Sequence, residues 1–426
     1  MVLHLPKDKR KTAILAGIIG NVMEWYDFAL YGYMASIISQ LFFPSDDKVA
    51  SLLATYGIFA AGFIMRPLGS GVFGWLGDTI GRSRTMLISV ALMVIPTFCL
   101  GLLPTYETVG VFAPILLVII RLIQGLSVGG EFSSSVTYLV ETSPASQRGL
   151  SGSWANFGSI SGMLLGSAVA TAVTSLMAEP MIKDWGWRLP FLFGGVLGSF
   201  AILLRRHLPK SDQFVQHDEK REKSSPLKEA FTLNFKETMQ AMLFASGYGV
   251  LFYIALVYLP TWMSEHAGVS LEHAMQMNTV AMVMLVPVIP LAGWISDRYI
   301  RRTHLISLSV VVMTLLAFPA FMWIDSAGKV AGTISQISLA MLIAIPCGVA
   351  PAMFVELFPT RDRLSGYSVA FNIGMGVIGG STPMVVTWLI SKTGYDIVPA
   401  AYVVIWSLIS LGALFTIRDR SREPLS

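Results

Sequence analysis

Charge is scarce in this sequence. Only 13% of its 426 residues are Asp, Glu, Lys or Arg, whereas soluble domains average about 25%. Hydrophobic residues make up 54% of the chain, and the mean hydropathy is +0.64. This balance excludes an ordinary soluble enzyme and indicates a protein that spans a membrane several times.

Residues for metal, disulfide or nucleotide chemistry are also scarce. The two cysteines, Cys99 and Cys347, lie in separate hydrophobic segments, and the six histidines show no ligand spacing, so we expect no metal and no disulfide framework. No stretch matches G-x4-G-K-[ST], so we expect no nucleotide site. An enzyme embedded in the membrane would need a nucleophile–base pair or a metal cluster. The sequence indicates neither, and we predict no enzymatic activity and no cofactor.

The hydrophobic residues gather into segments of the length that crosses a bilayer, about 20 helical residues each. There are twelve of them: 13–40, 49–73, 85–103, 110–140, 151–177, 187–205, 238–260, 274–295, 304–324, 330–352, 365–391 and 397–417. None alternates in polarity as the strands of a membrane barrel do. The sequence therefore predicts an all-α membrane protein with twelve transmembrane helices.

The basic residues are distributed unevenly between the two sides of this arrangement. The loops that follow the odd-numbered segments lie on one side of the membrane and hold only Lys48, Lys183, Lys329 and Lys392. Most of the 30 Lys and Arg residues lie in the other loops and at the termini, on the opposite side. The positive-inside rule then places both termini in the cytoplasm. The net charge of +4 thus reflects topology, and we expect a lipid bilayer rather than a nucleic acid around this protein. The first segment is too long and too acidic for a cleaved signal peptide, so we expect it to be retained.

The chain divides into two halves with internal similarity. The polar stretch 206–236 separates residues 1–205 from residues 237–426, and we interpret it as a cytoplasmic linker between two six-helix halves. "GWLGDTIGRSR" at 74–84 matches "GWISDRYIRR" at 293–302. A second match follows the fourth segment of each half, where Glu141, Pro144 and Arg148 correspond to Glu356, Pro359 and Arg363. Two motifs repeated in the same order indicate pseudo-symmetric halves, a common plan among transporters.

These motifs resemble those of a known family. Gly74-x3-Asp78-x2-Gly81-Arg82-x-Arg84 is similar to the signature loop of the major facilitator superfamily, and Arg121-x2-Gln124-Gly125 is similar to a second, structural motif of that superfamily. "GNVMEWYDF" at 20–28, "GFIMRPLG" at 62–69, "QGLSVGGEF" at 124–132 and "DWGWRLPF" at 184–191 resemble the metabolite:proton symporters. The segment "SPASQRGLSGSWANFGSISG" is most similar to the proline/betaine transporters, while the α-ketoglutarate and citrate permeases share most other motifs. The resemblance implies a monomeric symporter of the bacterial inner membrane.

Several polar residues lie inside the predicted spans. Asn21, Glu24, Asp27 and Tyr31 follow one another at helical spacing and form one stripe on the first span. A charge at the centre of an isolated span costs about 2.5–3.5 kcal/mol, so these residues must face a cavity or a partner. The fourth span carries Arg121, Gln124 and Glu131 on one face, and Arg66 and Arg188 belong to the second and sixth spans. One interpretation is a set of ion pairs that only lock helices together; the other is a charged transport cavity.

The cavity interpretation assigns roles to individual residues. We expect a carboxylate in a partly dry cavity to carry the proton, with Asp27 first, Glu131 second and Glu24 third. Arg66 and Arg188 are candidates for holding a substrate carboxylate through two parallel hydrogen bonds, although Arg188 can instead be an anchor at the external end of its span. The remaining candidates for substrate contact are uncharged, and aromatic ones suit a quaternary ammonium group or simple packing: Tyr26, Asn156, Tyr253, Tyr258 and Asn372.

The repeated loops predict a cytoplasmic gate. Their charged residues can form a network that holds the halves together while the central site faces outward. The candidates in the first half are Gly74, Asp78, Arg82, Arg84, Glu141 and Arg148, and those in the second half are Asp297, Arg301, Glu356 and Arg363.

The sequence as a whole predicts a proton-coupled secondary carrier that imports a small organic solute by alternating access. A zwitterion such as proline or betaine is favoured as the solute. A mono-, di- or tricarboxylate is the first alternative, and a passive facilitator with the same fold is the second.

Overall fold

The computed structural model describes residues 7–80, 82–127, 131–207, 234–360 and 363–425. This part of the chain is helical and contains no strand. The helices before the linker, which we call the N-terminal half, are α1(Lys7–Tyr33), α2(Ala35–Phe42), α3(Lys48–Ile80), α4(Arg82–Gly101), α5(Tyr106–Val109), α6(Phe112–Ser127), α7(Glu131–Glu141), η1(Ala145–Gln147), α8(Arg148–Leu176), α9(Glu179–Met181), η2(Ile182–Gly186) and α10(Arg188–His207). Most of the predicted linker, residues 208–233, lies outside the described residues.

The helices after the linker form the C-terminal half. They are α13(Phe235–Tyr253), η3(Ile254–Tyr258), α14(Leu259–His266), α15(Leu271–Leu285), α16(Val288–Arg298), α17(Arg302–Leu357), α18(Arg363–Phe371), η4(Asn372–Gly379), α19(Thr382–Thr393) and α20(Val398–Thr416). Helices satisfy their own backbone hydrogen bonds, which a lipid environment without water requires.

Membrane-crossing segments account for most of these helices. Within the described residues, nine are long and apolar enough to cross a bilayer: Lys48–Gly69, Phe112–Glu141, Ala145–Leu176, Phe235–His266, Leu271–Arg298, Arg302–Ile324, Val330–Leu357, Gly366–Thr393 and Val398–Thr416. The other three predicted spans lie on α1, α4 and α10. The all-α membrane fold is confirmed, and the count of twelve spans stays a prediction.

Helix α17 contains two spans that fold back on each other. At about 1.5 Å per residue, a straight helix would place Ser309 and Leu342 about 50 Å apart. The Ser309 hydroxyl instead donates to the Leu342 carbonyl oxygen at 2.5 Å. The segments Arg302–Ile324 and Val330–Leu357 therefore lie side by side, as the two separate spans of the sequence prediction require.

Prolines explain where several helices bend. Pro287 separates the end of α15 from the start of α16. The π-helical turn η3 directly precedes α14, and two residues separate η4 from α19; these helices carry Pro260 and Pro383 in their first two positions. A proline removes one backbone donor and crowds the carbonyl four residues earlier, and a widened turn is one way for the chain to accommodate this.

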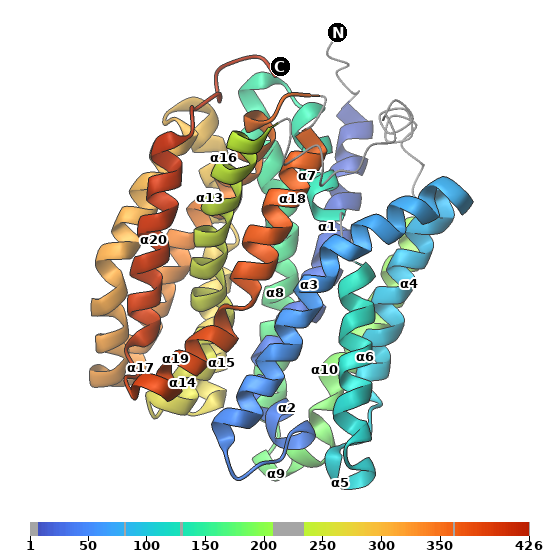
Figure 1. The fold of residues 1–426 in the computed structure, drawn as a ribbon, viewed down its shortest axis with the longest axis vertical. Coiled ribbons are helices and arrows are strands. Elements are labelled where there is room, and N and C mark those ends of the chain that lie inside the picture. The colour runs from blue at the N-terminus through green and yellow to red at the C-terminus, as the bar shows by residue number, and fades with distance from the viewer. Residues whose placement is uncertain (1–6, 81, 128–130, 208–233, 361–362, 426) are drawn as a thin grey trace.

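The two halves pack against each other along the long axis of the bundle (Figure 1). Helix α8 of the N-terminal half contacts α15, α16 and α17, and α3 contacts η4 and α19. The start of α1 and the end of the described chain lie at the same end of the bundle, which we call the terminal end. The short helices α2, α5, α9 and α14 lie at the opposite end.

Glycines permit the closest helix crossings. Gly125 of α6 faces the backbone of Gly62 in α3 so closely that an added Cβ would collide with the Gly62 carbonyl. Gly162 of α8 meets the backbone of Val22 in α1 in the same way. Small residues at such crossings allow the van der Waals contact that drives helix association in membranes.

We expect Gly125→Ala to lower the free energy of unfolding by about 1–3 kcal/mol, because the new methyl group must push α3 and α6 apart. The melting temperature of the detergent-purified protein measures this. Gly57→Ala is the matched control, because a Cβ there meets only Met384 Sδ, at 3.7 Å. Equal melting temperatures for the two variants would contradict the close crossing.

Candidate functional site

Helix α1 directs its two central carboxylates toward different neighbouring helices. Glu24 lies 3.4 Å from Arg66 of α3, measured from Oε1 to Nη2, and Asp27 lies 3.3 Å from Arg121 of α6, measured from Oδ2 to Nη1. All four side chains are at most 4% exposed. Residues three apart on a helix share a face, and here the two carboxylates on that face each pair with a different arginine. Asn21 continues the stripe and donates to the Ala155 carbonyl of α8.

The Asp27 pair is embedded in a hydrogen-bonded cluster. The Thr97 hydroxyl of α4 lies 2.9 Å from Asp27 Oδ1 and accepts a hydrogen bond from the Gln124 amide at 3.0 Å. Arg121 also donates to Gln124 Oε1 at 3.1 Å, and its guanidinium lies 3.8 Å from the centre of the Tyr31 ring. This cluster shows what the Arg121–Gln124–Gly125 motif does. Gly125 brings α6 against α3, Arg121 pairs with Asp27, and Gln124 binds both Arg121 and Thr97. Thr97 could not be predicted from the sequence, because an isolated threonine in a span carries no signal.

The Glu24–Arg66 pair lies against aromatic rings. The Arg66 guanidinium is 4.6 Å from the Phe28 ring centre, 4.5 Å from Phe63 and 5.7 Å from Trp25. Contacts of this kind stabilise a cation by attraction to the face of the ring. The arginine is therefore held by one carboxylate and several aromatic faces.

Aromatic residues also join this pair to the C-terminal half. Trp25 packs edge-on against Phe252 at 5.5 Å, and Phe63 packs edge-on against Tyr253 at 5.4 Å, between ring centres. Phe59 lies 6.0 Å from the same tyrosine ring. We call these five residues (Trp25, Phe59, Phe63, Phe252 and Tyr253) the aromatic junction.

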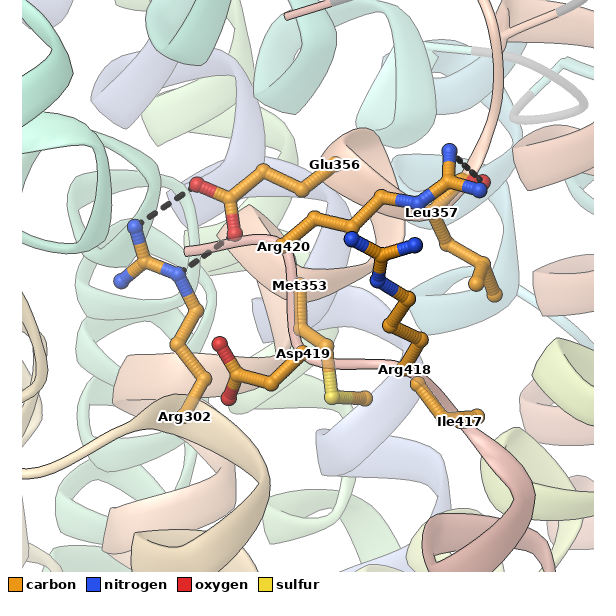
Figure 2. A pocket seen from close by; sticks show the side chains of 8 residues that line it. All are labelled: Arg302, Met353, Glu356, Leu357, Ile417, Arg418, Asp419 and Arg420. Carbon is orange, nitrogen blue, oxygen red and sulfur yellow. Dashed lines mark hydrogen bonds and ion pairs between the residues drawn. The ribbon is translucent and has the colours of Figure 1, made fainter. Parts of the chain in front are cut away.

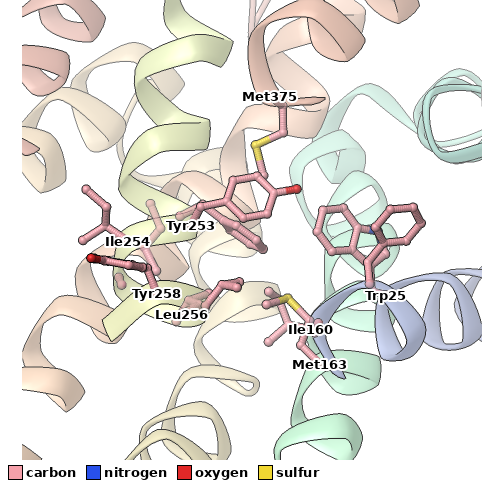
Figure 3. Packing of buried hydrophobic residues seen from close by; sticks show 14 of the residues in the cluster. Trp25, Ile160, Met163, Tyr253, Ile254, Leu256, Tyr258 and Met375 are labelled. Carbon is pink, nitrogen blue, oxygen red and sulfur yellow. The ribbon is translucent and has the colours of Figure 1, made fainter. Parts of the chain in front are cut away.

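Two polar atoms in the junction lack hydrogen-bond partners among the described residues. They are Trp25 Nε1 and the Tyr253 hydroxyl, and both are buried. Figure 3 shows the Tyr253 hydroxyl pointing toward Trp25 from the opposite half, with Ile160 and Met163 of α8 and Met375 of η4 around them. Buried polar groups are nearly always hydrogen-bonded in native structures, so two such atoms in the aromatic junction suit a polar ligand.

The other uncharged candidates occupy different places. Tyr258 accepts a hydrogen bond from Thr387 at 3.3 Å and packs edge-on against Tyr56. Asn156 of α8 donates to the Cys347 carbonyl at 2.7 Å and so bridges the halves. Asn372 begins η4, and its amide donates to Ser368 of the preceding turn. All three are buried, and the structure does not join them to Tyr253 in one cluster.

Tyr26 and Arg188 are directed toward the outer helices of the N-terminal half. The Tyr26 hydroxyl donates to the Pro190 carbonyl at 2.6 Å, which fixes α1 against α10. Arg188 donates to the Leu103 and Asp184 carbonyls at 3.0 and 3.3 Å, and its guanidinium lies over the Trp187 ring. These contacts favour the alternative that Arg188 anchors the end of its span.

Ion pairs between the predicted gate residues cross the two halves at the terminal end. Arg363 of α18 pairs with Glu141 of α7 at 2.6 Å. Arg148, the first residue of α8, lies 3.7 Å from Glu356 of α17. The two copies of the repeated Glu–Pro–Arg motif thus contact each other reciprocally, the arginine of each copy binding the glutamate of the other.

Asp297 extends this network through the backbone. Its carboxylate accepts hydrogen bonds from the Gly149 and Leu150 amides at 2.7 and 2.9 Å, in the first turn of α8, where amide groups have no acceptor in their own helix. The arginine that binds Asp297 and Glu356 is Arg302, not Arg301, which the repeat spacing selected. Arg301 precedes α17 and is exposed, whereas Arg302 is the first residue of that helix and is buried.

Several predicted site residues lie outside what the structure describes. The backbone of Gly74, Asp78, Arg82, Arg84 and Glu131 belongs to α3, α4 and α7, but the placement of these side chains is not described. Their proposed roles in the gate and in proton transfer stay predictions.

Uncharged side chains join α8 to α15 toward the opposite end of the interface. Thr279 of α15 lies 2.8 Å from the hydroxyls of both Ser167 and Thr171 of α8. Asn278 donates to Ser167 at 3.1 Å, and Gln276 donates to Ser175 at 3.1 Å. The described contacts therefore join the halves on both sides of the aromatic junction, which leaves the central residues enclosed.

Similarity to known proteins agrees with this geometry. A family profile described as "Sugar (and other) transporter" matches residues 12–232 and again residues 224–418. The proline/betaine transporter of Escherichia coli (strain K12) is 35% identical over 429 residues, which cover 98% of this chain and 85% of that protein. The glycine betaine/proline/ectoine/pipecolic acid transporter OusA of Dickeya dadantii is 36% identical over 427 residues, covering 97% and 84%.

Solved structures support the fold. The partially occluded, inward-open xylose transporter XylE from E. coli superimposes with a TM-score of 0.76 at 17% identity, covering 98% of this chain and 99% of that one. An inward-open form of the same transporter gives 0.73. The family profile and the relatives that match 97–98% of this chain agree with the charged spans and the repeated motifs. This chain is a multi-pass inner-membrane protein and a solute transporter, not an enzyme, and it belongs to the major facilitator superfamily.

Proposed function

We propose that this transporter is a proton symporter that imports a small zwitterion of the proline or betaine type. One observation carries the proposal: the buried Glu24–Arg66 pair adjoins an aromatic junction that contains two unsatisfied polar atoms. The site lies between the halves, where an alternating-access carrier binds its solute. All of the residues involved come from one chain, so we propose that the monomer is the functional unit.

The chemistry of a zwitterion matches the chemistry of this site. A guanidinium binds a carboxylate through two parallel hydrogen bonds, which gives Arg66 a role. Aromatic faces attract a quaternary or secondary ammonium group, which gives Trp25, Phe63 and Tyr253 a role. The names of the E. coli and D. dadantii relatives, which mention proline and betaine, support the same class of solute.

Proton coupling is assigned to the carboxylates of α1 and α7. Asp27 is our first candidate, because its cluster links α1 to α4 and α6 at once. Glu131 and Glu24 follow. Protonation of Glu24 would release Arg66 toward the solute carboxylate, so this residue offers a direct link between proton and solute binding.

Alternating access needs one gate on each side of the site. We assign the ion pairs at the terminal end to the cytoplasmic gate, because the positive-inside rule places the termini in the cytoplasm. We assign the uncharged contacts between α8 and α15 to the external gate.

A di- or tricarboxylate is the alternative solute, and the geometry favours it less. A second carboxylate would need a second available cation near the junction. Arg121 is bound to Asp27 and Gln124, and Arg188 is bound to backbone carbonyls.

Ligand binding to the purified protein tests the solute class. We expect proline or glycine betaine to raise the melting temperature, whereas citrate and α-ketoglutarate leave it unchanged. Arg66→Ala should weaken zwitterion binding by about tenfold to a hundredfold, the range for hydrogen bonds to charged groups. Arg188→Ala is the matched control and should bind as the parent does. Stabilisation by citrate alone, or equal affinity in Arg66→Ala, would contradict the proposal.

Solute-driven proton movement tests the coupling. In proteoliposomes, addition of the solute should acidify the lumen of vesicles that contain the parent protein. Asp27→Asn should still exchange labelled solute across the membrane but should no longer move protons or accumulate solute, because the amide cannot titrate. Glu24→Gln, tested in parallel, ranks the two carboxylates. Accumulation by the parent that survives collapse of the proton gradient would instead support a passive or differently coupled carrier.

A further inference from the structure

The segment that follows α20 folds back across the terminal end. Residues 417–425, which we call the strap, leave the helix after Thr416 and contact both halves. Figure 2 shows part of the strap beside the Arg302–Glu356 pair, with Asp419 next to that pair and the Arg420 guanidinium directed to the Leu357 carbonyl.

Asp419 attaches the strap to the C-terminal half. Its Oδ2 accepts hydrogen bonds from the amide and the hydroxyl of Thr303, at 2.9 and 3.1 Å. Thr303 is the second residue of α17, and such amides have no acceptor in their own helix, so the carboxylate caps α17. Burial raises the pKa of Asp419, but hydrogen bonds from Ser421 and Thr303 outweigh it and hold the pKa below its usual value. The carboxylate is therefore charged at neutral pH.

Glu423 attaches the strap to the N-terminal half. Its backbone carbonyl accepts a hydrogen bond from Arg148 Nη1 at 2.9 Å. The same guanidinium nitrogen lies 3.7 Å from Glu356, in the ion-pair network between the halves. A turn closed by the Glu423 amide and the Arg420 carbonyl, at 3.0 Å, positions the acceptor. Arg420 donates in turn to the Leu357 carbonyl at the end of α17.

We propose that the strap is a latch that stabilises the closed state of the terminal end. Asp419 and Arg420 hold the strap to α17, and the Glu423 carbonyl holds it to α8. The two halves therefore cannot separate there without breaking the contacts on one side. Opening toward the cytoplasm, in the orientation proposed above, thus requires release of the strap as well as loss of the ion pairs. The latch is independent of solute and proton binding, since no strap residue lies at the aromatic junction.

The native Cys347 reports opening of this end. Its side chain is buried, its carbonyl accepts from Asn156 of the other half, and its sulfur accepts from the Tyr248 hydroxyl. Asn156 lies eight residues, about 12 Å, into α8 from Arg148. Separation of the halves exposes the thiol, and in a Cys99→Ser background it is the only cysteine left. The rate of maleimide labelling of this protein in nanodiscs therefore follows the fraction of molecules in which the terminal end is open.

We expect Asp419→Ala to raise the labelling rate about five- to thirtyfold, because it removes the two hydrogen bonds that join the strap to Thr303 at the start of α17. Two matched controls should label at the parental rate. Arg422→Ala alters an exposed strap residue, and Glu423→Ala removes a side chain that pairs with exposed Arg418 but keeps the carbonyl that binds Arg148.

Two further variants separate latching from a general loss of structure. Thr303→Val removes one of the donors to Asp419 and should raise the rate about two- to tenfold. In an Arg148→Ala background, where the strap has lost its partner on α8, Asp419→Ala should add little. A folded Asp419→Ala protein with the parental rate would overturn the proposal, as would an undiminished effect in the Arg148→Ala background. Should Asp419→Ala fail to fold, a parental rate for Thr303→Val would overturn it. None of these measurements uses solute or a proton gradient, so their outcome is distinct from that of the proposed function.

Discussion

The pairing of the α1 carboxylates with arginines of α3 and α6 is the constraint on which the N-terminal half depends. A lone charge at the centre of the bilayer costs about 2.5–3.5 kcal/mol, and removal of one partner from a buried pair costs about 3–5 kcal/mol. Glu24, Asp27, Arg66 and Arg121 can lie in the membrane only in register with one another. The close crossing at Gly125 and the bond from Tyr26 to α10 maintain that register.

The two halves contribute different chemistry to their interface. At the aromatic junction the N-terminal half brings the Glu24–Arg66 pair, whereas the C-terminal half brings Phe252 and Tyr253. The two ends of the interface also differ. Ion pairs, helix-terminal amides and the strap close the terminal end, while hydroxyl and amide side chains join α8 to α15 toward the other end. When the halves separate, water can replace the uncharged hydrogen bonds between α8 and α15 one at a time. The ion pairs at the terminal end share partners, so several of them must break together.

Much of this architecture could be predicted from the sequence, because helical spacing and duplication are local signals. The stripe Asn21–Glu24–Asp27 required an inward-facing α1, and the repeated Glu–Pro–Arg motif selected both members of the Glu141–Arg363 and Arg148–Glu356 pairs. Partner choice could not be predicted in this way. Spacing alone does not show that Thr97 meets Asp27, that Arg302 rather than Arg301 turns inward, or that Arg188 binds carbonyls. These outcomes depend on how helices distant in sequence cross.

A double-mutant cycle on Asp27 and Arg121 tests the central constraint most directly. The measurement is the free energy of unfolding of the detergent-purified protein for Asp27→Asn, Arg121→Gln and the two combined. We expect Arg121→Gln alone to be destabilised by about 3–5 kcal/mol, because it leaves a buried carboxylate unpaired. The double variant should regain most of that loss, since two neutral amides replace two charges. If the loss of unfolding free energy in the double variant equalled the sum of the losses in the two single variants, the account would be contradicted, because the two charges would then not depend on each other.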